Sequence, residues 1–207
     1  MRFSDLKESV AGLTSEVKAK LNKVTHENGS GYNRKPIGNA VDAVLRGTAT
    51  VGDLIVMIQT TNNGGPVASY RSSLPKSMQV PEEIEIIKKA TSLAKKMAKN
   101  TVEKEEASLL LAIRGVVAKV TESDLQDVRS SLAKEESPEF VEKMMGLITA
   151  SVASPKLRDI GSDFSGDTPL KMLRTHLGVR HEVSTAIREI EWAYHDLNVL
   201  KRLAKIN

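Results

Sequence analysis

The stretch Ala107-Ser-Leu-Leu-Leu-Ala-Ile-Arg-Gly-Val-Val-Ala-Lys-Val120 decides the fold that we predict for this 207-residue chain. Only Ser108, Arg114, Gly115 and Lys119 interrupt its apolar side chains, so a helix through it is apolar on nearly every side. Such a helix is normally enclosed by other helices. The stretch is shorter than the roughly 20 apolar residues that span a bilayer. It therefore predicts the central helix, at about 107–120, of an all-α, multi-helix bundle.

The prolines also favour an all-α fold. Three of them follow a serine or threonine, as in Ser137-Pro138. A hydroxyl at the N-cap followed by proline at the first helical position is a common start of a helix. Together with Pro36 and Pro81, which follow other residues, five of the seven prolines are expected to begin helices: Pro36, Pro81, Pro138, Pro155 and Pro169.

The spacing of turn residues divides the chain into three parts. Residues 60–80 contain Asn62-Asn-Gly-Gly-Pro66 and Pro75, which predict irregular structure. An irregular segment of this length is uncommon inside a compact domain. We therefore expect a helical arm and a pair of short helices in residues 1–60, a linker in residues 61–80, and the main bundle in residues 81–207.

The composition limits the possible functions. The absence of cysteine rules out disulfides, zinc–thiolate sites and thiol nucleophiles. The opening residues do not resemble a signal peptide, so we expect a cytoplasmic protein, or a particle assembled in the cytoplasm, without a membrane span. Aromatic residues make up 3% of the chain, which is few for an enzyme pocket or a base-stacking surface. The net charge of +4 comes from 30 basic and 26 acidic residues and is only slightly basic.

A row of lysines on the helix predicted for residues 82–100 is the strongest basic patch. At 100° per residue they fall on the side opposite the isoleucines, together with Glu85. We call the following residues the lysine surface: Lys88, Lys89, Lys95, Lys96 and Lys99. It is either a solvated helix side, partly neutralised by Glu85, or a surface that contacts phosphates independently of sequence.

Two predicted loops place a tyrosine beside basic residues. Tyr32 precedes Arg34 and Lys35, and Tyr70 precedes Arg71. Aromatic and guanidinium groups together can stack on unpaired bases. These residues are therefore candidates for nucleic-acid binding, although ordinary loop tyrosines have the same appearance.

The last predicted helix, about 179–206, carries apolar residues on two sides. One side follows a nearly heptad spacing. The other side presents Trp192, Val199, Leu203 and Ile206, which we expect at an oligomer interface. Residues 122–142 contain seven acids and two bases, and this acidic segment is a possible partner for the lysine surface of a neighbouring subunit.

The sequence has no recognisable catalytic constellation. His181-Glu182 begins like the zinc motif H-E-x-x-H, but position 185 is Thr. No phosphate-binding glycine motif or nucleophile elbow is present. We therefore expect no catalytic residue, no cofactor and no metal.

Three functions remain in order of preference. The first is a structural protein that self-associates, or binds other subunits, within a larger particle of viral, phage or nucleoprotein type. The second is a sequence-nonspecific RNA- or DNA-binding protein that uses the lysine surface and the loop residues. The third is an all-helical enzyme with a carboxylate-based site.

Overall fold

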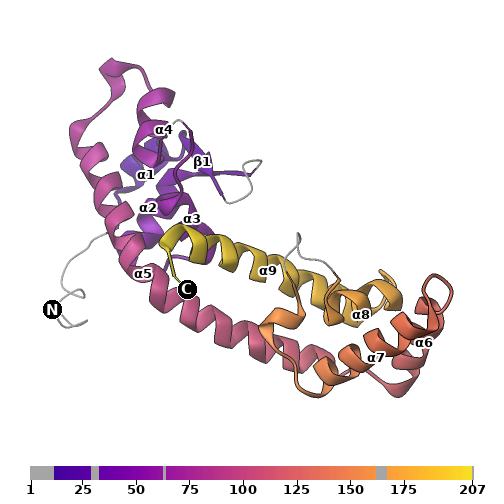
Figure 1. Cartoon of the computed structure of the whole chain (residues 1–207). Helices are drawn as coiled ribbons and strands as arrows, with labels where there is room; N and C mark the ends of the chain where they lie inside the picture. Colours follow the sequence, from indigo (N-terminus) through magenta and orange to yellow (C-terminus); the bar gives the residue numbers. More distant parts are fainter. Residues whose placement is uncertain (1–11, 29–32, 63, 162–166, 207) are drawn as a thin grey trace. The chain divides into compact units, whose positions relative to one another are not determined.

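The fold is all-α, as the sequence predicted. The computed structural model describes residues 12–28, 33–62, 64–161 and 167–206, and this part of the chain holds nine α-helices and one two-stranded sheet (Figure 1). The chain divides into two compact units. Unit 1 comprises Met1–Val102 and Val199–Asn207, and unit 2 comprises Glu103–Asn198. None of the helices in the described residues is both long enough and apolar enough to span a membrane.

Unit 1 consists of short helices and one hairpin. The helices are α1 (Ser15–Leu21), α2 (Ile37–Arg46), α3 (Val51–Ile58), α4 (Pro66–Ser73) and the 3₁₀ helix η2 (Lys76–Met78). Strands β1 (Thr25–Glu27) and β2 (Arg34–Pro36) pair antiparallel, with His26 opposite Lys35. The first part of α5 (Pro81–Val117) and the last residues of α9 (Glu182–Ala204) also belong to this unit.

Local signals explain where these helices begin and end. The Thr50 hydroxyl accepts a hydrogen bond from the Asp53 amide at 3.3 Å, and the Asp53 carboxylate accepts one from the Thr50 amide at 3.0 Å. This reciprocal capping box starts α3. Gly47 ends α2 with a φ of 73°, a left-handed conformation that glycine adopts without a steric penalty.

Residues 61–80, which we predicted to be a linker, contain the helices α4 and η2. Pro66 opens α4, and Tyr70 on that helix is 0% exposed. The Gly-Gly-Pro signal marks the start of a helix here, because proline fits the first helical position. Along the chain, the boundary between the two units falls within α5, between Val102 and Glu103.

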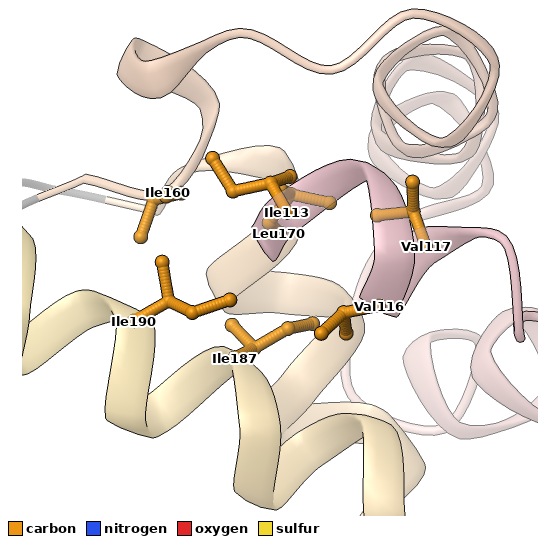
Figure 2. Close-up of a pocket in the computed structure, with 7 residues that line it drawn as sticks. All are labelled: Ile113, Val116, Val117, Ile160, Leu170, Ile187 and Ile190. Carbon is orange, nitrogen blue, oxygen red and sulfur yellow. The ribbon is translucent and has the colours of Figure 1, made fainter. Parts of the chain in front are cut away.

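Unit 2 consists of the rest of α5 together with α6 (Glu122–Leu132), α7 (Pro138–Ala153), the 3₁₀ helix η3 (Leu157–Asp159), α8 (Pro169–Leu177) and α9 as far as Asn198. Figure 2 shows apolar side chains from α5, the residue after η3, α8 and α9 that gather around one space. These residues are Ile113, Val116, Val117, Ile160, Leu170, Ile187 and Ile190, and the space between them has no room for a water molecule. This region is packed core.

The helix at 107–120 exists but is not enclosed on all sides. It forms the end of α5 and stops at Val117. Leu109, Ile113 and Val117 are buried, whereas Leu111 is 65% exposed. The prediction of an enclosed helix was wrong because most of the exposed residues here are alanine, serine or glycine, which offer little apolar area to bury.

The prolines act as predicted in most cases. Pro81, Pro138 and Pro169 are the first residues of α5, α7 and α8, and Pro36 is the N-cap of α2. Pro155 does not begin a helix, because Ser154 ends α7 and the next helical turn is η3.

Candidate functional surfaces

The lysine surface lies on the unit 1 part of α5 and is exposed to solvent. All five lysines are exposed. Lys88 pairs with Glu85 at 2.7 Å, and the other four make no ion pair with any described residue. At 1.5 Å per residue, the row from Lys88 to Lys99 is about 16 Å long.

Burial on the opposite side of α5 explains this exposure. Ile87, Ala90, Ala94 and Ala98 are all 0% exposed. These positions recur at steps of three and four, so they occupy one side of the helix. The lysines are confined to the other side of α5. Four of their ammonium groups, without an ion-pair partner among the described residues, therefore lie on one helix.

Tyr70 is not available for stacking on a base. It is fully buried, its hydroxyl donates to Glu83 Oε2, and it accepts a hydrogen bond from the Val80 amide at 3.0 Å. Burial raises the pKa of Tyr70, and the bond to Glu83 adds to this effect. The prediction that Tyr70 binds nucleic acid was therefore wrong, whereas Arg71 is exposed on α4.

The other loop candidates lie on the hairpin. Arg34 and Lys35 are exposed residues of β2. The Arg34 guanidinium donates to the Thr25 hydroxyl at 3.2 Å and to the Thr25 carbonyl at 3.1 Å. Arg34 therefore links β2 to β1 within the hairpin. Tyr32 lies outside the described residues.

Glu83 has a role that the sequence analysis missed. Glu83 is buried and accepts a hydrogen bond from Lys20 Nζ at 2.9 Å. The hydrogen bond to Glu83 raises the pKa of Lys20 despite the opposing effect of burial. Glu83 thus joins α1, α4 and α5. A signal was present in the sequence, because Glu83 lies four residues before Ile87 on the apolar side of α5.

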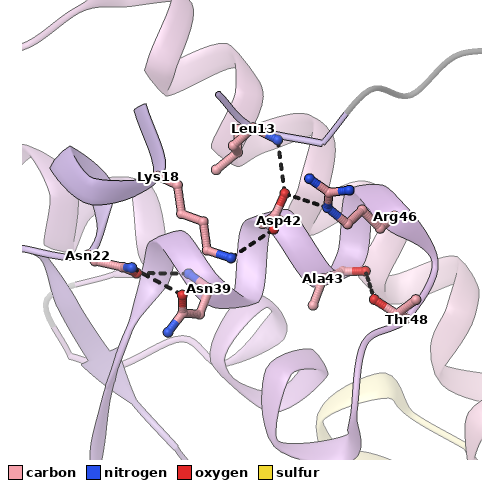
Figure 3. A network of polar contacts seen from close by, with 8 residues as sticks. All are labelled: Leu13, Lys18, Asn22, Asn39, Asp42, Ala43, Arg46 and Thr48. Atoms are coloured by element: carbon pink, nitrogen blue, oxygen red, sulfur yellow. Dashed lines mark hydrogen bonds and ion pairs between the residues drawn. The ribbon is translucent and has the colours of Figure 1, made fainter. Parts of the chain in front are cut away.

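Asp42 is the centre of a second polar network in unit 1 (Figure 3). Its carboxylate accepts hydrogen bonds from the Leu13 amide at 2.9 Å, Lys18 Nζ at 2.9 Å and Arg46 Nε at 3.0 Å. Burial raises the pKa of this carboxyl, but the hydrogen bonds from Lys18, Arg46 and Leu13 outweigh it and hold the pKa below its usual value. Both oxygens are occupied, so Asp42 ties α1 to α2.

His26 is buried and neutral. Its Nε2 lies 3.0 Å from the Gln59 carbonyl, and its Nδ1 lies 2.7 Å from the Ser69 hydroxyl. A carbonyl can only accept, so Nε2 carries the proton and Nδ1 accepts from Ser69. Burial lowers the pKa of His26. The ring joins β1, the end of α3 and α4.

The residues predicted at an interface on α9 differ in exposure. Trp192 is 65% exposed, whereas Val199 is only 5% exposed. Leu203 and Ile206 are half-buried. Val199 thus packs within its own chain, because the end of α9 is part of the core of unit 1. The predicted surface is reduced mainly to Trp192.

An uncharged row on α5 in unit 2 was not singled out by the sequence analysis. We call the following exposed residues the outer row: Ala107, Ser108, Leu111, Ala112 and Gly115. A methyl group added to Gly115 would meet nothing within 4 Å. Beyond the row lies a groove of about 400 Å³, lined by Arg114, Val117, Ala118, Val152, Ala153, Ser154 and Pro155. The groove lining combines apolar side chains with the exposed, charged Arg114 and the Ser154 hydroxyl.

A smaller hollow of about 140 Å³ lies between α8 and α9 in unit 2. It is lined by Arg174, Thr175, Val179, Ser184, Thr185 and Arg188. Arg174 pairs with Glu191 at 3.2 Å. Neither this hollow nor the groove beside the outer row is lined by a carboxylate. Among the described residues, no group of three or more His, Asp or Glu side chains has an arrangement that could hold a metal ion.

Charge is divided unequally between the two units. Unit 1 contains 18 Lys and Arg against 9 Asp and Glu, a net charge of +9. Unit 2 contains 12 against 17, a net charge of −5. The slightly basic total therefore conceals one strongly basic and one acidic body.

Comparison with protein families, curated proteins and solved structures finds no match to this chain. Function must therefore be argued from these surfaces.

Proposed function

We propose that this chain is a structural subunit that self-associates through unit 2 as part of a larger assembly. The observation that carries the proposal is Leu111, a large apolar side chain that is 65% exposed in the middle of the outer row. An isolated exposed leucine is ordinary. Here it lies in a row of uncharged residues and adjoins a groove with a mixed polar and apolar lining.

The occupant that fits the outer row best is the same row of a second copy. Alanine, serine and glycine keep side-chain bulk low, so two helix backbones can approach closely on either side of Leu111. A two-fold contact brings identical patches together, and the members of the outer row carry no charges of their own that would repel the copy, although the exposed Lys104 and Arg114 border the row. The lysine surface lacks this property, because its positive charges would repel those of a second copy.

Trp192 supplies a second contact. It is the only tryptophan in the chain and is 65% exposed on α9. Tryptophan is enriched among the residues that contribute most to interfaces. A subunit with two separate contacts can build assemblies larger than a dimer. The absence of cysteine fits assembly in the reducing cytoplasm.

The test is the native mass of the full chain, measured by light scattering over a range of concentrations. We expect multiples of the 22.6 kDa chain and a shift toward the monomer in Leu111→Glu. Val179→Glu is the matched control, because Val179 is 81% exposed in the same unit but lies outside the outer row. Circular dichroism checks that each variant is folded.

Two results would refute the proposal. One is a wild-type chain that remains monomeric at millimolar concentration. The other is an oligomer whose mass changes equally in Leu111→Glu and Val179→Glu, since a general effect of added charge would then explain the change. Trp192→Ala tests the second contact separately and is expected to lower the largest mass without abolishing the dimer.

A further inference from the structure

We propose that the lysine surface on α5 binds the phosphate backbone of double-stranded nucleic acid. The proposal does not depend on self-association through unit 2, because the lysine surface belongs to unit 1. It rests on the charge of unit 1, on the exposure of the five lysines, and on the burial of Tyr70, the aromatic side chain that would otherwise stack on bases.

The lysines are free to contact phosphates. Lys89, Lys95, Lys96 and Lys99 are exposed and have no ion-pair partner among the described residues. No internal ion pair must be broken before these four ammonium groups meet an anion. The net charge of unit 1, which is +9 with these lysines included, favours approach of any polyanion from a distance.

The dimensions of the surface fit a duplex. The lysine row is about 16 Å long on a continuous helix. Duplex DNA carries one charge per roughly 1.7 Å of its axis when both strands are counted, so about ten phosphates lie along this length, and one side of the duplex presents only part of them. Five lysines cannot neutralise more than five of them, which sets an upper limit of about 4.5 on the steepness of the salt dependence.

The same surface is poorly suited to reading bases. Tyr70 is buried, and Arg34 is held by Thr25. Lysine acts on phosphate as a compact point charge without the planar fork of arginine. Binding through α5 therefore depends on backbone charge, and duplexes of different sequence are bound equally.

A second copy of this chain is the competing partner. Unit 2 has a net charge of −5, and exposed acids on it include Asp127, Glu135, Glu136 and Glu139. These acids are distributed over α6, the following turn and the start of α7. Other acids there are already engaged, since Glu142 pairs with Arg129 and Asp124 with His181. A regular row of phosphates matches the lysine surface better than these scattered carboxylates do.

The experiment measures fluorescence anisotropy of a labelled, mixed-sequence DNA duplex titrated with the full chain at several salt concentrations. The test variant is Lys95→Gln, Lys96→Gln and Lys99→Gln combined. The control is Lys104→Gln, Lys134→Gln and Lys143→Gln, three exposed lysines of unit 2 without an ion-pair partner among the described residues. Both variants lose three positive charges, and glutamine preserves the helix.

We expect the wild type and the control to bind with similar affinity and similar salt dependence. The test variant should bind at least tenfold more weakly at low salt, and its slope of log affinity against log salt should fall by about 2.7, or 0.9 per lost contact. A second duplex of unrelated sequence should give the same constants.

Three results would overturn the proposal. The first is no anisotropy change for the wild type at low salt. The second is an equal loss of binding in the control, because net charge alone would then be responsible. The third is a test variant that keeps its DNA affinity but loses self-association, which would assign the lysine surface to the acidic unit of a second copy.

Discussion

Replacing Asp42 by asparagine should destabilise unit 1 by about 1–2 kcal/mol without creating a cavity. The substitution preserves shape and one acceptor oxygen, so the Leu13 amide keeps its partner. It removes the negative charge that Lys18 and Arg46 share, and it can place an NH₂ donor against the Lys18 ammonium. The loss is therefore electrostatic.

The magnitude follows from the exposure of the two cations. A buried hydrogen bond to a charged group contributes about 1.5–3 kcal/mol. The side chains of Lys18 and Arg46 are 37% and 53% exposed, so water replaces much of the interaction that they lose when Asp42 is no longer charged. Each pair is then worth about 0.5–1 kcal/mol. With a urea dependence of about 2 kcal/mol per molar, the unfolding midpoint falls by about 0.5–1 M.

The pH dependence gives a second, independent measurement. The pKa of Asp42 is lower in the folded protein than the ordinary value of 3.8 for an aspartate. A lowered acid pKa gives stability that is present above the unfolded pKa and is lost as pH falls through the folded pKa. The difference between wild type and Asp42→Asn should thus be constant from pH 7 to 5 and should shrink below about pH 4.

Urea unfolding followed by circular dichroism at pH 7, 5 and 3 tests both expectations. Asp127→Asn is the control, since Asp127 is an exposed carboxylate without an ion-pair partner among the described residues. Equal midpoints for wild type and Asp42→Asn at pH 7 would refute the proposed network. A difference that stays constant to pH 3 would show that the loss comes from shape and not from charge.

Three further predictions concern single positions. Tyr70→Phe removes a buried hydroxyl that both donates and accepts, and it should lower the free energy of unfolding by about 1–3 kcal/mol in urea titrations. The wild type should lose stability as pH falls from about 6.5 toward the lowered pKa of His26, and His26→Phe should lack this part of the profile. Gly47→Ala should cost about 1 kcal/mol because its φ is 73°, whereas Gly146→Ala, in an open helical position, should raise the thermal midpoint.

The elements that could be predicted from sequence are those with a strong local signal. The lysine surface is an example, because a helix of this periodicity leaves its charged side in water whatever packs on the other side. The pair of short helices predicted in residues 1–60 is present as α2 and α3, and Pro36 lies at the start of α2 as expected. In each case the deciding residues lie within one or two turns of each other.

The errors arose where a distant partner decides the outcome. Tyr70 sits in a polar segment rich in turn residues, and its burial depends on Glu83, thirteen residues away. Asp42 is bound by residues up to 29 positions distant. The exposure of Leu111 has a different cause, because no other element of the described residues covers it. An apolar stretch is buried on every side only if enough neighbouring elements exist to cover it. A single sequence does not show how many there are.

The total charge of the chain does not show how its charges are distributed. Acids and bases nearly balance over the chain, which leaves a net charge of +4. The balance is lost once the chain is divided within α5, where one body has +9 and the other −5. Electrostatic attraction depends on the charge that a partner meets within a Debye length of about 10 Å at 0.1 M salt, and not on the sum over the molecule. A polyanion at the lysine surface therefore encounters a strongly basic protein, and raising the salt should weaken that contact while leaving contacts through the uncharged outer row nearly unchanged.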